Sequence, residues 1–248
     1  MAGTIDIERV YCMNQAGIFI QVICAILAAM ILSYLFANGR RCKATYSYML
    51  CVFLLLLWNI AEIILLTSIN KEQEMLALKI KFLPIVYIGV SWLYFCLTIT
   101  NHKITKCKYF KFILISFPAV CYAFLLTNEY HHLFYKDVIF KTRLIRGPVF
   151  LIHTIESYLC IIIGTIYFAK SLKKAGKRTY RILFFLLLFL PLTVDILMLT
   201  DVISIKGLDM TAQSLLITLI IIGIIVYQKK FLNLLPVASR HFIEKMSV

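Results

Sequence analysis

Long apolar runs alternate with short polar segments along almost the whole chain. A helix needs about 20 apolar residues to cross a bilayer, and the chain holds seven runs of roughly that length. Within lipid only helices and closed barrels satisfy every backbone hydrogen bond, and the runs lack the alternating pattern of barrel strands. The expected fold is therefore all-α, an integral membrane bundle of seven transmembrane helices. The predicted spans are residues 15–37, 46–69, 76–100, 111–127, 149–170, 182–200 and 211–229.

The composition supports a single membrane domain. The 248 residues are 62% hydrophobic and only 15% charged, too apolar for a compact water-soluble shell. No linker, repeat or polar segment is long enough to form a second folded unit. We expect an extracellular tail over 1–14, a transmembrane domain over 15–229 and a cytoplasmic connecting helix over 230–248.

The basic residues predict the direction of the spans. Asp6 and Glu8 outweigh Arg9 before the first span, and most of the 26 Lys and Arg residues follow spans one, three, five and seven. Cytoplasmic loops of membrane proteins carry such an excess, so the N-terminus is expected outside and the C-terminus in the cytoplasm. The net charge of +14 gathers at helix ends rather than on one soluble face, which disfavours nucleic acid and favours contact with membrane lipids.

Three carboxylates and one histidine fall inside the predicted spans. Charged groups cost about 2.5–3.5 kcal/mol at the centre of a membrane helix, so each should face a partner or water. With the predicted directions, all four lie in the outer half of the bundle and come from three helices. Their clustering predicts a polar, ligand-binding cavity open to the outside. The four residues are Glu62, His153, Glu156 and Asp195.

Simpler interpretations of these residues remain open. Glu62 could reach the surface along its own stem, or pair with Lys79 or Lys81 at the start of the next span. His153 and Glu156 stand at i, i+3 and could satisfy each other. Their spacing also resembles one half of a carboxylate-bridged metal site, but only one copy is present, so no metal is expected.

The loop between spans four and five is the longest connection and contains adjacent His131 and His132. Loops longer than about 12–15 residues usually act as lids or binding segments. An interfacial aromatic belt would explain Phe134 and Tyr135, but it explains two neighbouring histidines poorly. We therefore expect both histidines over the cavity, with a short strand-like stretch at 138–140 following them.

The usual motifs of soluble enzymes are absent, including phosphate-binding loops, nucleophile elbows and metal-binding His-Glu-x-x-His helices. The chain is therefore not expected to be an enzyme or to need a cofactor. Two other interpretations stay open: an intramembrane enzyme using His153, Glu156 or Asp195 as acid and base, and a small-molecule transporter. Transport is the weaker of the two, because Pro84, Pro118 and Pro191 do not fall at matching positions of two halves.

Seven segments in order, from about residue 50 onward, resemble the N-terminal seven-transmembrane region of bacterial sensor histidine kinases, which also precedes diguanylate cyclases. The segments are WNIAEII, KIKFLPIVYIGVSWLYFCLTITNHK, TNEYHHLF, RGPVFLIHTIESYLCIIIG, FLPLTVDILML, LDMTAQSLL and KKFLNLLPVASRHFIEKM.

The resemblance extends to single positions. Glu62 fits the acid of span two, His131 the histidine after Thr-Asn, Pro191 the proline of span six and Asp209 the acid before span seven. Two positions depart from the pattern. Asp195 stands where Asn is expected, and Ala212 replaces a usual Pro.

The resemblance implies that the chain is the sensory part of a longer protein. In the family, the stretch matched by Pro236, Arg240, Glu244 and Met246 leads into a PAS or kinase domain. A homodimer in the bacterial plasma membrane and a response regulator reached through the kinase domain are further implications. A diguanylate cyclase output and a stand-alone regulator that has lost its output remain alternatives.

The sequence thus predicts a sensor for a small extracellular or membrane-dissolved ligand. The binding residues would be Glu62, His153, Glu156, Asp195 and Asp209, with His131 and His132 above them. A shift of span seven would pass through residues Lys229 to Met246, with a joint at Pro236. Protonation of His153 is an alternative signal, because histidine titrates near neutral pH.

Overall fold

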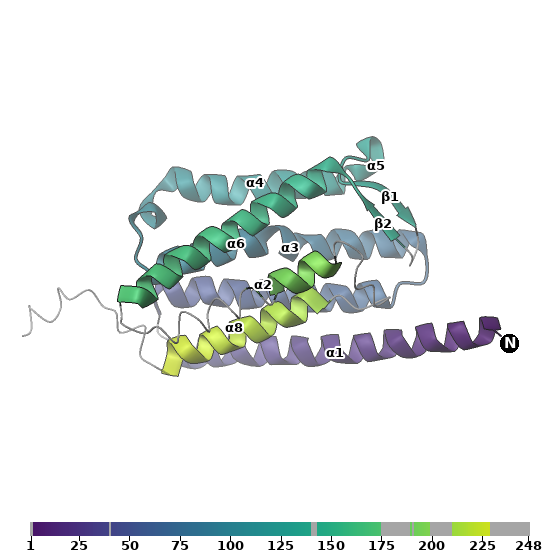
Figure 1. Cartoon of the computed structure of the whole chain (residues 1–248), viewed down its shortest axis with the longest axis horizontal. Coiled ribbons are helices and arrows are strands. Elements are labelled where there is room, and N and C mark those ends of the chain that lie inside the picture. Colours follow the sequence, from purple (N-terminus) through teal and green to yellow (C-terminus); the bar gives the residue numbers. More distant parts are fainter. Residues whose placement is uncertain are drawn as a thin grey trace, which may run out of the picture.

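The computed structural model of the chain describes residues 2–39, 41–139, 143–174, 189, 191–198 and 210–228. Six long helices run along one common direction (Figure 1). They are α1 (Ala2–Asn38), α2 (Lys43–Leu66), α3 (Lys71–Ile99), α4 (Lys108–Leu126), α6 (Pro148–Lys174) and α8 (Met210–Gln228). A further helical stretch covers 191–198. The described part of the chain is thus an all-α membrane bundle with one small hairpin.

The helix bounds follow the predicted spans closely. Among the described residues, five helices are long and apolar enough to cross a membrane, and α8 has a shorter apolar stretch at Met210–Ile224. The predicted span 182–200 falls outside the described residues except for 189 and 191–198. The first predicted span, 15–37, agrees with the candidate membrane span Gln15–Asn38, although the helix α1 itself begins at Ala2. Residues of the predicted N-terminal tail therefore continue the first helix.

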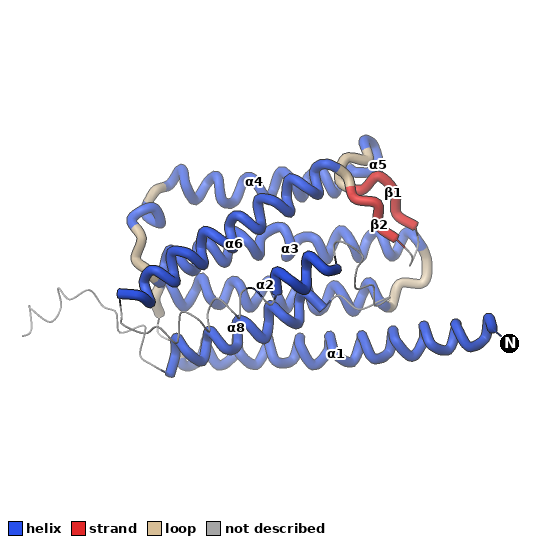
Figure 2. Tube along the Cα trace, viewed as in Figure 1, coloured by secondary structure: helices blue, strands red, loops and turns tan. Residues whose placement is uncertain are grey.

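A two-stranded antiparallel sheet lies at one end of the bundle, beside the turn between α2 and α3 (Figure 2). It pairs β1 (Tyr135–Ile139) with β2 (Arg143–Arg146), and its ladder shifts register between Tyr135 and Asp137. The short helix α5 (Asn128–His131) precedes it, and the 3-10 helix η1 (Lys103–Lys106) connects α3 to α4 at the opposite end (Figure 1). We call the end that carries the sheet the hairpin end.

The bundle is built around α3, which is buried along most of its length, whereas most residues of α4 and of the part of α1 at 15–38 are exposed. In a soluble protein such exposed apolar faces would be a liability, but in a membrane they contact lipid. The main core joins α2, α3, α6 and α8 around Trp92 and Phe95. A second core lies under the hairpin, where rings meet edge to face with centroids less than 6 Å apart. Its aromatic members are Phe82, Phe134, Tyr135 and Phe150.

Glycines allow α3 and α6 to approach closely. A Cβ on Gly89 would stand 3.0 Å from the Cα and the carbonyl oxygen of Ser157, and one on Gly164 would stand 3.1 Å from the Cα of Leu93. Small residues at such crossings let membrane helices pack closely. This packing favours helix association, because in lipid there is no hydrophobic driving force between helices. The two glycines therefore fix α3 and α6 against each other along most of their shared length.

We expect Gly89→Ala to lower the unfolding free energy by about 1–3 kcal/mol, because the added methyl group meets the backbone of Ser157 as well as its side chain. Thermal unfolding of the purified chain in detergent measures the effect. Ala119→Leu is the matched control, since Ala119 lies on an exposed face of α4 and the larger side chain meets only the surroundings. Equal melting temperatures for Gly89→Ala and the wild type would contradict the tight crossing.

Candidate functional site

A cavity of about 280 Å³ lies at the hairpin end between α3, α6, the helical stretch 191–198 and α8. Its apolar wall comes from α2, α3, α6, the stretch 191–198 and α8, and it includes three aromatic rings of the second core, Phe82, Tyr135 and Phe150. The apolar side chains of this wall include Trp58, Phe82, Phe150, Ile161, Leu192 and Leu215. Its polar wall includes Lys81, Arg146, His153, Tyr158, Asp195 and Thr211. An apolar hollow with a few convergent polar groups is the usual form of a small-molecule site.

Asp195 links two elements that border this cavity. The hydroxyl of Tyr158 on α6 donates to its Oδ2 over 2.6 Å, and the hydroxyl of Thr211 on α8 donates to its Oδ1 over 3.2 Å. Each carboxylate oxygen thus accepts a hydrogen bond from a different helix. This bridge holds the beginning of α8 to α6 through the stretch 191–198.

Glu62 does not line the cavity but forms an ion pair behind its wall. Its Oε2 lies 2.6 Å from the Nζ of Lys81, and both side chains are almost fully buried. Two charges together cost far less in an apolar bundle than either one alone. Of the partners that the sequence offered for Glu62, the structure selects Lys81, while Lys79 pairs with Glu129 instead.

His153 and Glu156 separate despite their closeness in sequence. His153 lines the cavity and is 3% exposed, whereas Glu156 is not part of the wall. Their Nδ1 and Oε2 atoms are 3.8 Å apart, beyond hydrogen-bond distance. The other oxygen of Glu156 accepts from the thiol of Cys160, one turn further along α6. The i, i+3 spacing therefore brings the two groups near each other without a direct hydrogen bond.

The two loop histidines shape the turn rather than the cavity wall. His131 accepts from the backbone N–H of Leu133 at Nδ1, so its proton sits on Nε2 and is donated to the hydroxyl of Thr127 over 3.0 Å. Thr127 in turn donates to the carbonyl of Ala123. His132 is exposed and takes a left-handed backbone conformation with φ of 54°, which ends α5. Neither histidine is among the residues that line the cavity.

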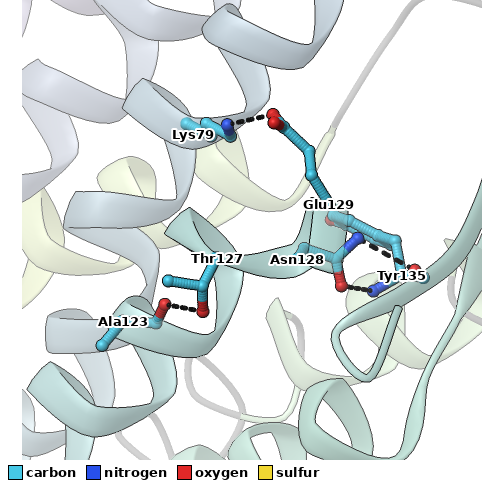
Figure 3. A network of polar contacts seen from close by, with 6 residues as sticks. All are labelled: Lys79, Ala123, Thr127, Asn128, Glu129 and Tyr135. Carbon is cyan, nitrogen blue, oxygen red and sulfur yellow. Dashed lines mark hydrogen bonds and ion pairs between the residues drawn. The ribbon is translucent and has the colours of Figure 1, made fainter. Parts of the chain in front are cut away.

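Asn128 is the residue that builds the hairpin, although no sequence pattern singled it out. Its Oδ1 accepts from the backbone N–H groups of Phe134 and Tyr135. Its Nδ2 donates to the carbonyl of Tyr135, and Figure 3 shows both contacts with Tyr135. The side chain is 4% exposed. One buried amide therefore satisfies three backbone groups where the chain turns from α5 into β1.

A surface ion pair ties the same turn to α3. The Nζ of Lys79 donates to Oε1 of Glu129 over 2.7 Å (Figure 3). This hydrogen bond and the lysine charge hold the pKa of Glu129 below its usual value. The carboxylate is exposed, so the contact orients the turn and adds little stability.

Sequence reasoning missed Lys81, Arg146, Tyr158 and Thr211 as residues of the cavity wall. The sequence suggested Lys81 only as a partner of Glu62 and did not single out Arg146, and residues such as Tyr158 and Thr211 are common in membrane helices.

Several predicted residues lie outside the described part of the chain. They are Asp209, Lys229, Pro236, Arg240 and Met246. Among the residues that the structure describes, no three His, Cys, Asp or Glu side chains form a group that could hold a metal ion.

Comparison with known proteins identifies a family. A family model described as the N-terminal 7TM region of histidine kinase matches residues 20–236. No curated protein and no solved structure matches the chain. The match begins within α1 and covers every described element that borders the cavity.

Removing one partner of the buried ion pair should destabilise the chain strongly. We expect Lys81→Met to cost about 3–5 kcal/mol, because it leaves the Glu62 carboxylate buried without its cation. The double variant Lys81→Met with Glu62→Leu should recover much of this loss, since it removes both charges together. Chemical unfolding of the three proteins in detergent measures these differences. A double variant as unstable as the single one would show that the pair is not an energetic unit.

Asn128→Ala should loosen the hairpin, because it leaves two N–H groups and one carbonyl without their partner, at about 1–3 kcal/mol for each buried group. Asn128→Asp keeps the acceptor and should have a smaller effect. Hydrogen exchange of the amides at 133–139 measures both, with Glu129→Gln as a control on an exposed neighbour. Unchanged protection in Asn128→Ala would rule out this role.

Proposed function

The chain belongs to the family of N-terminal seven-transmembrane regions of histidine kinases, and on this premise we propose that it is a receptor whose ligand occupies the cavity at the hairpin end. The family region is a sensory input region rather than a catalytic one. The single observation that supports the proposal best is the position of the cavity, whose wall includes both α6 and α8.

The bridge at Asp195 gives ligand binding a route to α8. A ligand in the cavity lies against Tyr158, Asp195 and Thr211 at once, so it can strengthen or break the hydrogen bonds that hold α8 to α6. A ligand shifts an equilibrium between two arrangements only by binding them with different affinity. The Asp195 bridge is a place where such a difference arises, because its two hydrogen bonds depend on the relative position of the helices.

The middle of α8 is also held by a specific contact. The hydroxyl of Tyr48 on α2 donates to the carbonyl of Leu219 over 2.7 Å. In our proposal, α8 moves as one element when the bridge at its beginning changes, and residues 229–248 carry the motion onward. A shift of one packed helix past its neighbours is a common form of such switches.

The proposed receptor has a defined orientation in the membrane. The excess of basic residues after α1, α3 and α6 supports a cytoplasmic position for the opposite end and an outside position for the hairpin end. Seven spans, a location in the bacterial plasma membrane, a homodimer and a kinase that passes phosphate to a response regulator complete the proposed receptor.

We expect Thr211→Val to free the beginning of α8, because the variant removes the hydroxyl that donates to Asp195. Hydrogen exchange of the amides at 211–220 in the 248-residue chain should become severalfold faster. In the full-length kinase, the same change should shift basal autophosphorylation severalfold in membrane vesicles.

Thr193→Val serves as the matched control, since the Thr193 hydroxyl donates to the carbonyl of Phe189 in the preceding turn and does not line the cavity. Autophosphorylation that is the same in Thr211→Val, Thr193→Val and the wild type would refute the route through the Asp195 bridge.

A further inference from the structure

We propose that the ligand of the cavity is a small uncharged molecule with an apolar body and one hydroxyl group, which donates a hydrogen bond to His153. The inference rests on the proposed function, since it names the ligand class of the same site. It follows from the lining of the cavity, from the contacts of its charged groups and from the position of the His153 ring.

The volume and lining set the body of the ligand. A cavity of about 280 Å³ is at the small end of the range for ligand sites, about 300–1,000 Å³. Its lining joins Trp58 and Ile161 of the main core to the rings of Phe82 and Phe150 of the second core. Such a surface favours an apolar body of modest length, such as one ring with a short alkyl chain.

The charged groups of the wall are engaged within the protein. The Nζ of Lys81 lies 2.6 Å from Oε2 of Glu62, and both oxygens of Asp195 accept hydrogen bonds from hydroxyl groups. Arg146 is not free either, and its guanidinium lies 5.6 Å from the centroid of the Phe150 ring. A charged ligand would have to displace a partner that the protein supplies, which is costly in an apolar setting. An uncharged ligand leaves all of these contacts intact.

His153 is the polar group of the wall that points to a ligand contact. Its side chain is 3% exposed and lines the cavity. Within the described part of the chain, its Nδ1 is enclosed and has no hydrogen-bond partner. Buried polar side chains in folded proteins nearly always have a partner, so an imidazole of this kind in a cavity wall indicates a site for one.

The neighbour of His153 on α6 determines which group the ligand must carry. Oε2 of Glu156 lies 3.8 Å from Nδ1, which is too far for a hydrogen bond but close enough to favour the proton on that nitrogen. A neutral imidazole with its proton on Nδ1 has an acceptor at Nε2. Because Nδ1 is enclosed beside Glu156, Nε2 is the nitrogen that remains for the cavity. A hydroxyl group can donate to this acceptor, whereas an ether or a ketone cannot.

Ser157 offers the ligand hydroxyl a second contact. It stands four residues after His153 on α6, so the two side chains lie on the same side of the helix, and both line the cavity. The serine hydroxyl can donate to the ligand oxygen while the ligand donates to His153. A site that uses both capacities of a hydroxyl group discriminates strongly against analogues that lack it.

Five probes with the same butylphenyl body separate the ligand classes. Para-butylphenol carries the hydroxyl, para-butylanisole masks it as an ether, para-butyltoluene lacks a polar group, and para-butylbenzoate and para-butylbenzamidinium are charged. Binding to the 248-residue chain is measured by calorimetry in nanodiscs of uncharged phosphatidylcholine, with empty nanodiscs as the reference for partitioning. We expect the phenol to bind about tenfold more tightly than the anisole and the toluene, and the two charged probes to bind most weakly.

Variants of His153 locate the hydrogen bond. His153→Asn keeps a polar group near the position of Nδ1 but not at Nε2, so it should weaken the phenol about tenfold and leave the toluene almost unchanged. His153→Gln reaches the position of Nε2 and should retain most of the phenol affinity. His132→Asn is the matched control, because it removes an exposed histidine at the same end that does not line the cavity. Toluene binding also reports that each variant remains folded.

A cavity-filling variant tests the site independently of the hydrogen bond. Thr154 lines the cavity, so Thr154→Phe should abolish binding of every probe. Its melting temperature in detergent reports that it is folded. In the wild type, the toluene should displace the phenol, since both occupy the same space.

The outcomes distinguish the ligand class from the site. Toluene binding as tight as that of the phenol, and lost in Thr154→Phe, would overturn the hydroxyl class and leave the cavity as the receptor site. Tighter binding of either charged probe than of the phenol would overturn the uncharged class in the same way. Phenol binding that falls equally in His153→Asn and His153→Gln would overturn the contact at Nε2. Equal calorimetric signals from the wild type and a folded Thr154→Phe with all probes would overturn the proposed site itself.

Discussion

The cost of an unpaired charge inside an apolar bundle governs how the hairpin end of this protein is built. Glu62 and Lys81 are both buried and meet at 2.6 Å, and Asp195 takes one hydroxyl hydrogen bond on each oxygen. A carboxylate without such partners would be costly in this apolar setting. Because the partners come from different helices, the same contacts that neutralise the charges also fix α2 to α3 and α6 to α8. These buried polar contacts therefore line or border the cavity and also hold together the helices around it.

The hairpin adds to this framework at the hairpin end. Asn128 binds three backbone groups of the turn, so β1 begins at a defined place, and Phe134 and Tyr135 enter the second core beside Phe82. The ladder then positions Arg146 opposite Tyr135 at the cavity wall. The short sheet thus places one cation, Arg146, at a part of the cavity wall where the helices place none.

The sequence predicted the helices well, because in a chain of this composition an apolar run of helical length is hardly compatible with anything but a membrane helix. Of the ionisable residues it singled out, His153 and Asp195 line the cavity. It could not tell which side of a helix faces the cavity, because these helices are apolar on every face and show almost no periodicity. Glu62 and Glu156 contact Lys81 and Cys160 instead. The role of Asn128 depends on backbone groups six and seven residues away, whose position only the folded turn defines.

The close crossing of α3 and α6 at Gly89 and Gly164 has a consequence for how the receptor would respond to different compounds. Two walls of the cavity belong to this tightly packed pair, so they yield little, and a change in volume would fall on the other walls, which include 191–198 and α8. A compound that fits the hollow would draw that side inward, while a bulkier relative with the same head group would press it outward. Agonists and antagonists of such a receptor would then differ in the width of their apolar part and share the same head group.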